Sequence, residues 1–263
     1  MVYPFLSSLL LSFQPQGMMG LNFDFNTCST DVWKNILGSD YMWLGFKNSI
    51  IRTVLGSGIS MLLTLGMAYP LSRSDFFGGK VFNRILVVSM LLNAGIIPSY
   101  LLIKNLGMLD SIWSLLLPGA INVYNLIILK SSMASFSKSI EEAATIDGAN
   151  DIIIFFRLVL PLSLPTIATI GLWVVLANWN SWFDVVMYIS SREKNLLPAI
   201  LQDMITESSI DASMNSKGAN ALPPTTDSMK AGATMFTTIP ILLVYPFLQK
   251  YFTKGVTVGA VKG

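Results

Sequence analysis

Charged and acid–base side chains are scarce in this chain of 263 residues. It contains no histidine, which is the commonest metal ligand. It contains a single cysteine, Cys28, which excludes an intramolecular disulfide. Charged residues make up 12%, against about 25% in soluble domains, whereas hydrophobic residues reach 52%. So few charges cannot cover a water-facing surface, and the net charge of +2 is too balanced for a nucleic-acid binder. We therefore expect an integral membrane protein.

Five stretches with few or no charged residues are long enough for a spanning helix, which needs roughly 20 apolar residues. They predict spans at about 50–72, 85–103, 111–129, 162–184 and 231–249. The apolar run Met1–Phe13 predicts an incomplete first span, either short or beginning upstream of Met1. The sequence thus predicts an all-α, polytopic transmembrane bundle of about six spans in the cell membrane. Residues 1–48 hold the partial first span and an outer loop, and residues 49–263 hold the core.

The loops predict an orientation. Lys250, Lys254 and Lys262 make the C-terminal tail basic without an acid, which is typical of a cytoplasmic segment. Counting back through the spans places residues 73–84 and 131–161 on the cytoplasmic side as well.

The outer segments are expected to be loops. The first, Phe13–Ser49, carries three aromatic residues that we interpret as anchors at the lipid headgroups and not as a platform for stacking sugars: Trp33, Tyr41 and Trp43. The second, Ser190–Lys230, is polar and loop-like. The residues alone make it a solvated connector, and the family resemblance set out below implies a surface for an extracytoplasmic partner.

The cytoplasmic segment 131–161 predicts a helix–turn–helix. Ser139 and Glu142 fit a capping box, Ser-x-x-Glu, which starts a helix. Asp147-Gly148 is expected to end that helix, because glycine takes the left-handed conformation common there. Asn150 or Asp151 then caps a second helix over 152–160, followed by Pro161 and Pro165, where a helix start tolerates a missing amide donor. From the residues alone this is either a well-capped connector or a docking element for a cytoplasmic partner.

The pattern Glu142-Ala-Ala-x-x-Asp-Gly-Ala149, followed by Phe155, Phe156 and Leu160-Pro161, resembles the EAA loop of ABC importer permeases. Further stretches resemble the carbohydrate-uptake branch of that family: Asn93–Tyr100, Asn105–Asp110, Leu117–Ala120, Trp179–Trp182 and Pro246–Gly255. From about residue 48 to 263 the chain is similar to the second permease subunit of poly- and oligosaccharide importers, kin to that of the maltose system. The resemblance implies the type I ABC importer permease fold.

The resemblance also implies a role and partners. The chain is expected to be a permease subunit without a catalytic or metal site, not an enzyme. Its partners would be a second homologous permease, two subunits that bind ATP and Mg²⁺, an extracytoplasmic solute-binding protein and a sugar. Residues carried over as contacts with the ATPase subunit are Glu142, Ala143, Ala144, Asp147, Gly148, Gly259, Lys262 and Gly263. For the last three, in the tail, a solvated chain end is the alternative.

The chain shows no energy source of its own. Ion-driven carriers commonly use ionisable residues within the membrane, whereas residues 53–72, 85–103, 111–129, 158–183 and 231–249 contain no Asp, Glu, Lys or Arg. Gly78-Gly79-Lys80 lacks the spacing and the hydroxyl residue of a phosphate-binding loop. These absences favour an external motor. A secondary carrier or channel powered without ATP is the alternative.

Polar residues of the fifth predicted span are candidates for the translocation path: Asn178, Asn180 and Asp184. Amides buried in lipid are costly unless paired, so the asparagines are expected to face the bundle interior. There they either form an interhelical hydrogen bond or line the path of the sugar. Gly56, Gly58 and Ser60 of the second span suit close helix packing.

Overall fold

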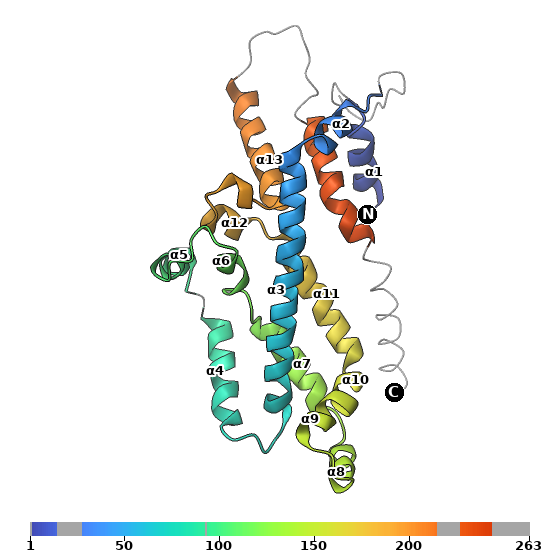
Figure 1. The fold of residues 1–263 in the computed structure, drawn as a ribbon, viewed down its shortest axis with the longest axis vertical. Helices are drawn as coiled ribbons and strands as arrows, with labels where there is room; N and C mark the ends of the chain where they lie inside the picture. The colour runs from blue at the N-terminus through green and yellow to red at the C-terminus, as the bar shows by residue number, and fades with distance from the viewer. Residues whose placement is uncertain (1, 15–27, 93, 215–226, 244–263) are drawn as a thin grey trace. The chain divides into compact units, whose positions relative to one another are not determined.

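The computed structural model describes residues 2–14, 28–92, 94–214 and 227–243, and every regular element in these ranges is a helix (Figure 1). This confirms the all-α prediction. The chain divides into two compact units, which we describe separately: unit 1 comprises residues 1–51 and 179–245, and unit 2 residues 52–178 and 246–263. Helix α3 (Asp40–Ser72) begins in unit 1 and ends in unit 2, whereas α11 (Leu164–Asn180) begins in unit 2 and ends in unit 1.

Unit 1 contains α1 (Val2–Leu11), α2 (Asp31–Leu37), α12 (Phe183–Tyr188), α13 (Leu197–Met214) and a helix over residues 227–243. Val32 and Ile36 lie one turn apart on α2 and are buried in the core of this unit. A Cβ built at Gly232 would lie 2.7 Å from both of these side chains. Glycine at residue 232 therefore lets the helix over 227–243 approach α2 closely.

The two outer segments expected to be loops contain helices, so this prediction is wrong. Phe13–Ser49 includes α2 and the start of α3, and Ser190–Lys230 includes α13. The reason is that a few apolar residues at helical spacing suffice to bury one face, although each segment is polar on average. Of the predicted interfacial anchors, Trp33 donates its indole N–H to Ser12 Oγ (3.1 Å) and Trp43 donates to the Leu37 carbonyl (2.8 Å). Their place at the headgroups stays a prediction.

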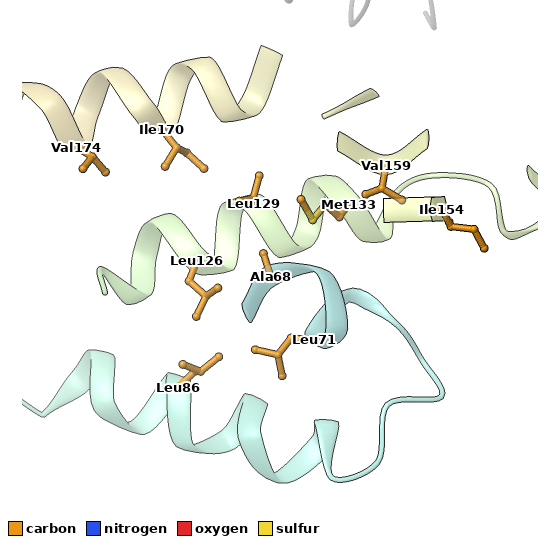
Figure 2. Packing of buried hydrophobic residues seen from close by; sticks show 10 residues of the cluster. All are labelled: Ala68, Leu71, Leu86, Leu126, Leu129, Met133, Ile154, Val159, Ile170 and Val174. Atoms are coloured by element: carbon orange, nitrogen blue, oxygen red, sulfur yellow. The ribbon is translucent and has the colours of Figure 1, made fainter. Parts of the chain in front are cut away.

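Unit 2 is built from the second part of α3 and the segments up to α11. These are α4 (Gly79–Leu91), α5 (Ile96–Asn105), α6 (Trp113–Leu116), α7 (Val123–Ala134), α8 (Lys138–Ile146), α9 (Asp151–Ile154), a π-helical turn η2 (Phe155–Val159) and α10 (Leu160–Leu162). Figure 2 shows the core of this unit, a cluster of buried side chains from α3, α4, α7, α9, η2 and α11. Because lipid solvates apolar side chains as well as a core does, close packing must hold such helices together.

Three of the predicted spans are not continuous helices, which corrects the prediction. The segment 111–129 is broken between α6 and α7, where Pro118 and Gly119 interrupt the helix. The segment 85–103 is broken between α4 and α5, where Gly95 has φ +83°. The segment 162–184 ends as a helix at Asn180, and Asp184 belongs to α12. Averaged hydropathy does not detect these breaks, because prolines and glycines change the backbone and barely change the mean.

Among the described residues, α3 is the single helix that is by itself long and apolar enough to cross a membrane. Counting each bent pair as one span, α4 with α5 and Asp151–Leu162 with α11, raises the number to three; the second pair is bent by 78°. Pro161 and Pro165 flank this bend and remove amide donors there. The predicted span 231–249 is helical through residue 243, and the remainder lies outside the described residues. The total of six spans stays a prediction.

Candidate docking site

The first helix of the segment 131–161, α8, begins earlier than the sequence predicts. Its N-cap is Ser137 and not Ser139, and the Ser137 side chain makes no capping hydrogen bond. The hydroxyls of Ser137 and Ser139 instead lie 2.6 Å apart and bond to each other. The predicted capping box of Ser139 and Glu142 is therefore wrong, and Glu142 is not used at its own helix start.

The end of α8 and the start of α9 follow the predicted chemistry. Gly148 has φ +84°, and the amide of Ala149 donates to the Ala144 carbonyl (3.0 Å), which closes the helix in the manner of a Schellman motif. Asn150 is the N-cap of α9, with its side-chain oxygen accepting from the Ile153 amide (2.9 Å). The helix–turn–helix is confirmed, and Asn150 is the capping residue of the two considered.

Helix α8 has an inner and an outer face. Ala144 is half-buried and packs, with Ala149, against the core of unit 2. Glu142, Ala143, Asp147 and Gly148 are exposed, and beside them Ile146 is 85% exposed. Figure 1 shows α8 at one end of unit 2, next to α9. Four of the five predicted contact residues in this loop are thus presented together, with an exposed isoleucine that a partner can cover.

Arg73, which follows α3, is the centre of a polar cluster that the sequence did not reveal. Its Nη1 lies 3.0 Å from Glu141 Oε2 and donates to the Tyr69 hydroxyl at 2.9 Å, and its Nη2 lies 3.5 Å from Asp151 Oδ1. Burial acts to lower the pKa of the Arg73 guanidinium, but Tyr69, Glu141, Asp151 and Asp75 outweigh it and hold that pKa above its ordinary value. The guanidinium therefore stays charged, and it joins the end of α3 to both helices of the helix–turn–helix.

An open cavity of about 680 Å³ lies beside α8. Its lining combines charged and apolar side chains from three segments: Arg73 and Asp75 after α3, Met133 of α7, and Glu141, Glu142 and Ile146 of α8. The cavity thus reaches from the Arg73 cluster to the edge of the exposed outer face of α8. Two features of the sequence point to this cluster: Arg73 is the first charged residue after an apolar run, and the segment 131–161 is rich in acidic residues. No local pattern, however, indicates that Arg73 contacts those acidic residues.

The predicted path residues occupy different environments. Asn178 donates its Nδ2 to the Val174 carbonyl of its own helix (2.9 Å), and its Oδ1 lies against Gly56. Asn180 is the last residue of α11 and is exposed. Asp184 accepts from Ser181 Oγ (2.7 Å) and from the Val185 amide (3.0 Å) at the start of α12. The Asn178 bond lies within α11 and is not the interhelical bond considered for it, and the path role of these residues stays a prediction. The expectation that Asn180 faces the interior does not hold within this chain. The tail residues Gly259, Lys262 and Gly263 lie outside the described residues.

Comparison with known proteins gives concordant matches. The family model described as binding-protein-dependent transport system inner membrane component matches residues 60–258. The polygalacturonan/rhamnogalacturonan transport system permease protein YtcP of Bacillus subtilis is 42% identical over 90% of this chain and 83% of its own length. Protein LplC of the same organism is 37% identical over 100% of this chain and 90% of its own length.

A solved structure agrees with these relatives. It is a chain of a bacterial ABC transporter involved in the import of the acidic polysaccharide alginate, with a TM-score of 0.84 and 29% identity over 95% of this chain and 90% of that chain. This agreement confirms the type I ABC importer permease fold. The chain belongs to the family of binding-protein-dependent transport system inner membrane components.

Proposed function

We propose that this chain is the transmembrane permease subunit of an ATP-driven importer of oligo- or polysaccharides. The observation that carries the proposal is the outer face of α8, where Glu142, Ala143, Asp147 and Gly148 are exposed together at the end of unit 2. The names of the relatives support a carbohydrate substrate. Because two of them concern polyuronates, polygalacturonan and alginate, an oligosaccharide of uronic acids is the first substrate to test.

The expected assembly has five protein subunits. A second homologous permease completes the translocation path, two ATP-binding subunits dock on the permeases, and an extracytoplasmic binding protein delivers the sugar. The family description, which makes transport dependent on a binding protein, supports the last of these. ATP and Mg²⁺ are assigned to the ATP-binding subunits, so this chain has no catalytic role.

The mechanism is alternating access. ATP binding closes the two ATP-binding subunits on each other and displaces the helix–turn–helix that is seated on them. The contacts of α8 and α9 with the end of α3 pass this displacement to the spanning helices, which then open to the outside. Hydrolysis of ATP lets the helices return. Asn180 is exposed at the end of α11, and we assign it to the path or to the contact with the second permease.

Uptake by proteoliposomes that contain the whole assembly tests the proposal. We expect uptake of a uronic-acid oligosaccharide to require ATP inside, the binding protein outside and both ATP-binding subunits. Uptake that continues without the ATP-binding subunits and follows an ion gradient would establish the secondary carrier or channel instead. A chemical change of the sugar by the purified chain would make it an enzyme and would also overturn the proposal.

A further inference from the structure

One side chain fastens the helix–turn–helix to the end of α3. The guanidinium of Arg73 contacts Glu141 in α8 at 3.0 Å and Asp151 in α9 at 3.5 Å. Its donors form a rigid planar fork, which fixes the direction as well as the distance of its partners. The side chains of Arg73 and Glu141 are 22% and 23% exposed, so solvent screens this contact less than an ordinary surface ion pair.

The two helices depend on Arg73 to different degrees. Helix α9 and the turn η2 that continues it have further contacts with α3. The Tyr69 hydroxyl donates to the Asp151 carbonyl of α9 (3.4 Å), and the Tyr69 ring lies 4.9 Å from the ring of Phe155 in η2. Helix α8 packs on the core through the small side chain of Ala144 and is linked to Arg73 through Glu141. Loss of the guanidinium is therefore expected to release α8 more than α9.

The charges around Arg73 increase this effect. Besides Glu141 and Asp151, Asp75 lies 3.6 Å from its Nε, so three carboxylates surround one cation. A neutral residue at position 73 would remove the attraction for all three. Because the Asp75 and Asp151 side chains are 77% and 76% exposed and screened by solvent, the loss falls mainly on the partly buried Glu141 of α8.

We propose that Arg73 is a positioning residue that holds α8 in a fixed orientation on α3, so that force applied to the outer face of α8 displaces α3. This inference rests on the proposed function, in which an ATP-binding subunit docks on that face. Without the guanidinium, α8 changes its orientation independently of α3, and a displacement of α8 no longer moves the spanning helix α3. The two neighbouring glutamates then have separate tasks: Glu142 is presented to the partner and Glu141 is held by Arg73.

The test compares Arg73→Gln with Arg84→Gln, the same change at an exposed arginine of α4, in the complete transporter. For Arg73→Gln we expect the ATP-binding subunits still to co-purify, while the ratio of ATP hydrolysis with and without sugar-loaded binding protein falls by about tenfold, within the usual range for a residue that couples two sites. Arg73→Lys keeps the positive charge but loses the planar arrangement of guanidinium donors, so the hydrolysis ratio should fall less than in Arg73→Gln. Arg84→Gln should leave it unchanged.

A double-mutant cycle and a distance measurement separate coupling from folding. Glu141→Gln should lower the same ratio, and adding it to Arg73→Gln should lower it no further, because both remove one link. Spin labels at the exposed residues Leu62 of α3 and Ile140 of α8, after Cys28→Ser, should show a broader distance distribution in Arg73→Gln.

Two different results would overturn different statements. If Arg73→Gln keeps both the hydrolysis ratio and the narrow distance distribution of the unsubstituted transporter, Arg73 does not position α8, and the permease assignment is untouched. If the unsubstituted assembly takes up sugar without its ATP-binding subunits, the proposed function itself fails.

Discussion

The carboxamide of Asn178 in α11 lies directly against Gly56 of α3. A Cβ built at residue 56 would be 2.5 Å from Asn178 Oδ1 and 3.0 Å from its Cγ. The Asn178 side chain is held by its bond to the Val174 carbonyl, so it cannot swing aside freely. Glycine at residue 56 is thus what allows these two helices to approach each other in unit 2.

The first prediction follows from this contact. Gly56→Ala should destabilise the protein by roughly 1–3 kcal/mol, as overpacking of a close contact does. Gly58→Ala is the matched control, because a Cβ there meets nothing within 4 Å, and replacing a helical glycine by alanine should stabilise by about 0.5–1 kcal/mol. The melting temperature of the detergent-solubilised protein measures both changes. Adding Asn178→Ala to Gly56→Ala should restore most of the loss; a loss that persists would show that Asn178 is not the obstacle.

The second prediction concerns the turn after α8. Gly148 has φ +84°, a conformation that costs a residue with a side chain roughly 1–2 kcal/mol. Gly148→Val should therefore displace α8 and lower uptake and stimulated ATP hydrolysis, with insertion into the membrane unchanged. Gly148→Asn should retain most of the activity, because asparagine tolerates the left-handed conformation. Wild-type uptake in the valine variant would contradict the docking role of this turn.

The third prediction separates two tryptophans of the same motif in unit 1. Trp179 is buried and donates its indole N–H to the Thr237 carbonyl (3.2 Å), whereas Trp182 is exposed. Trp179→Phe should lower stability by about 0.5–1.5 kcal/mol through the lost hydrogen bond. Trp182→Phe should leave the melting temperature nearly unchanged. Equal effects of the two substitutions would mean that the bond to Thr237 contributes nothing.

The fourth prediction concerns Asn180, the exposed residue at the end of α11. Asn180→Leu should lower uptake while the melting temperature of the isolated chain stays the same, because within this chain the side chain is exposed. Uptake is measured with the complete transporter in proteoliposomes, and the melting temperature with the isolated chain in detergent. A lower melting temperature with normal uptake would instead support a role in packing.

The fifth prediction concerns the tail. Deletion of residues 259–263, which include Gly259, Lys262 and Gly263, should lower stimulated ATP hydrolysis if the tail contacts the ATP-binding subunits. Steady-state hydrolysis by the assembled transporter is the measurement, with replacement of the same five residues by a Gly-Ser segment as the control for length. Unchanged kinetics in the deletion would show that the tail is a solvated end.

Sequence reasoning succeeded where the determining chemistry lies within a few residues. Gly148 and Asn150 end and start helices through their own backbone and side chain, so the helix–turn–helix was predictable. The prediction of the capping box was wrong because the hydroxyls of Ser137 and Ser139 bond to each other. The sequence pattern does not decide which of these two serines starts the helix.

Two other features were not predicted, each for a different reason. The breaks around Pro118 and Gly95 lie inside runs that are apolar enough to span, so hydropathy alone predicts one helix across each. Arg73 meets Glu141 and Asp151 because α3, α8 and α9 pack together, and these residues are far apart in the sequence. The excess of acids over bases in residues 131–161 is consistent with a neighbouring cation, but it does not identify which one.

The different surroundings of the neighbouring residues Glu141, which is paired with Arg73, and Glu142, which is exposed, limit which changes this loop can tolerate. Each added residue turns the following part of a helix by about 100°. A single insertion between Ser137 and Glu141 would therefore turn Glu141 away from Arg73, although composition and helix length would barely alter. Substitutions at the exposed positions can adapt the loop to a new partner, whereas the spacing from its first serine to Glu141 cannot change by one residue without breaking the ion pair with Arg73.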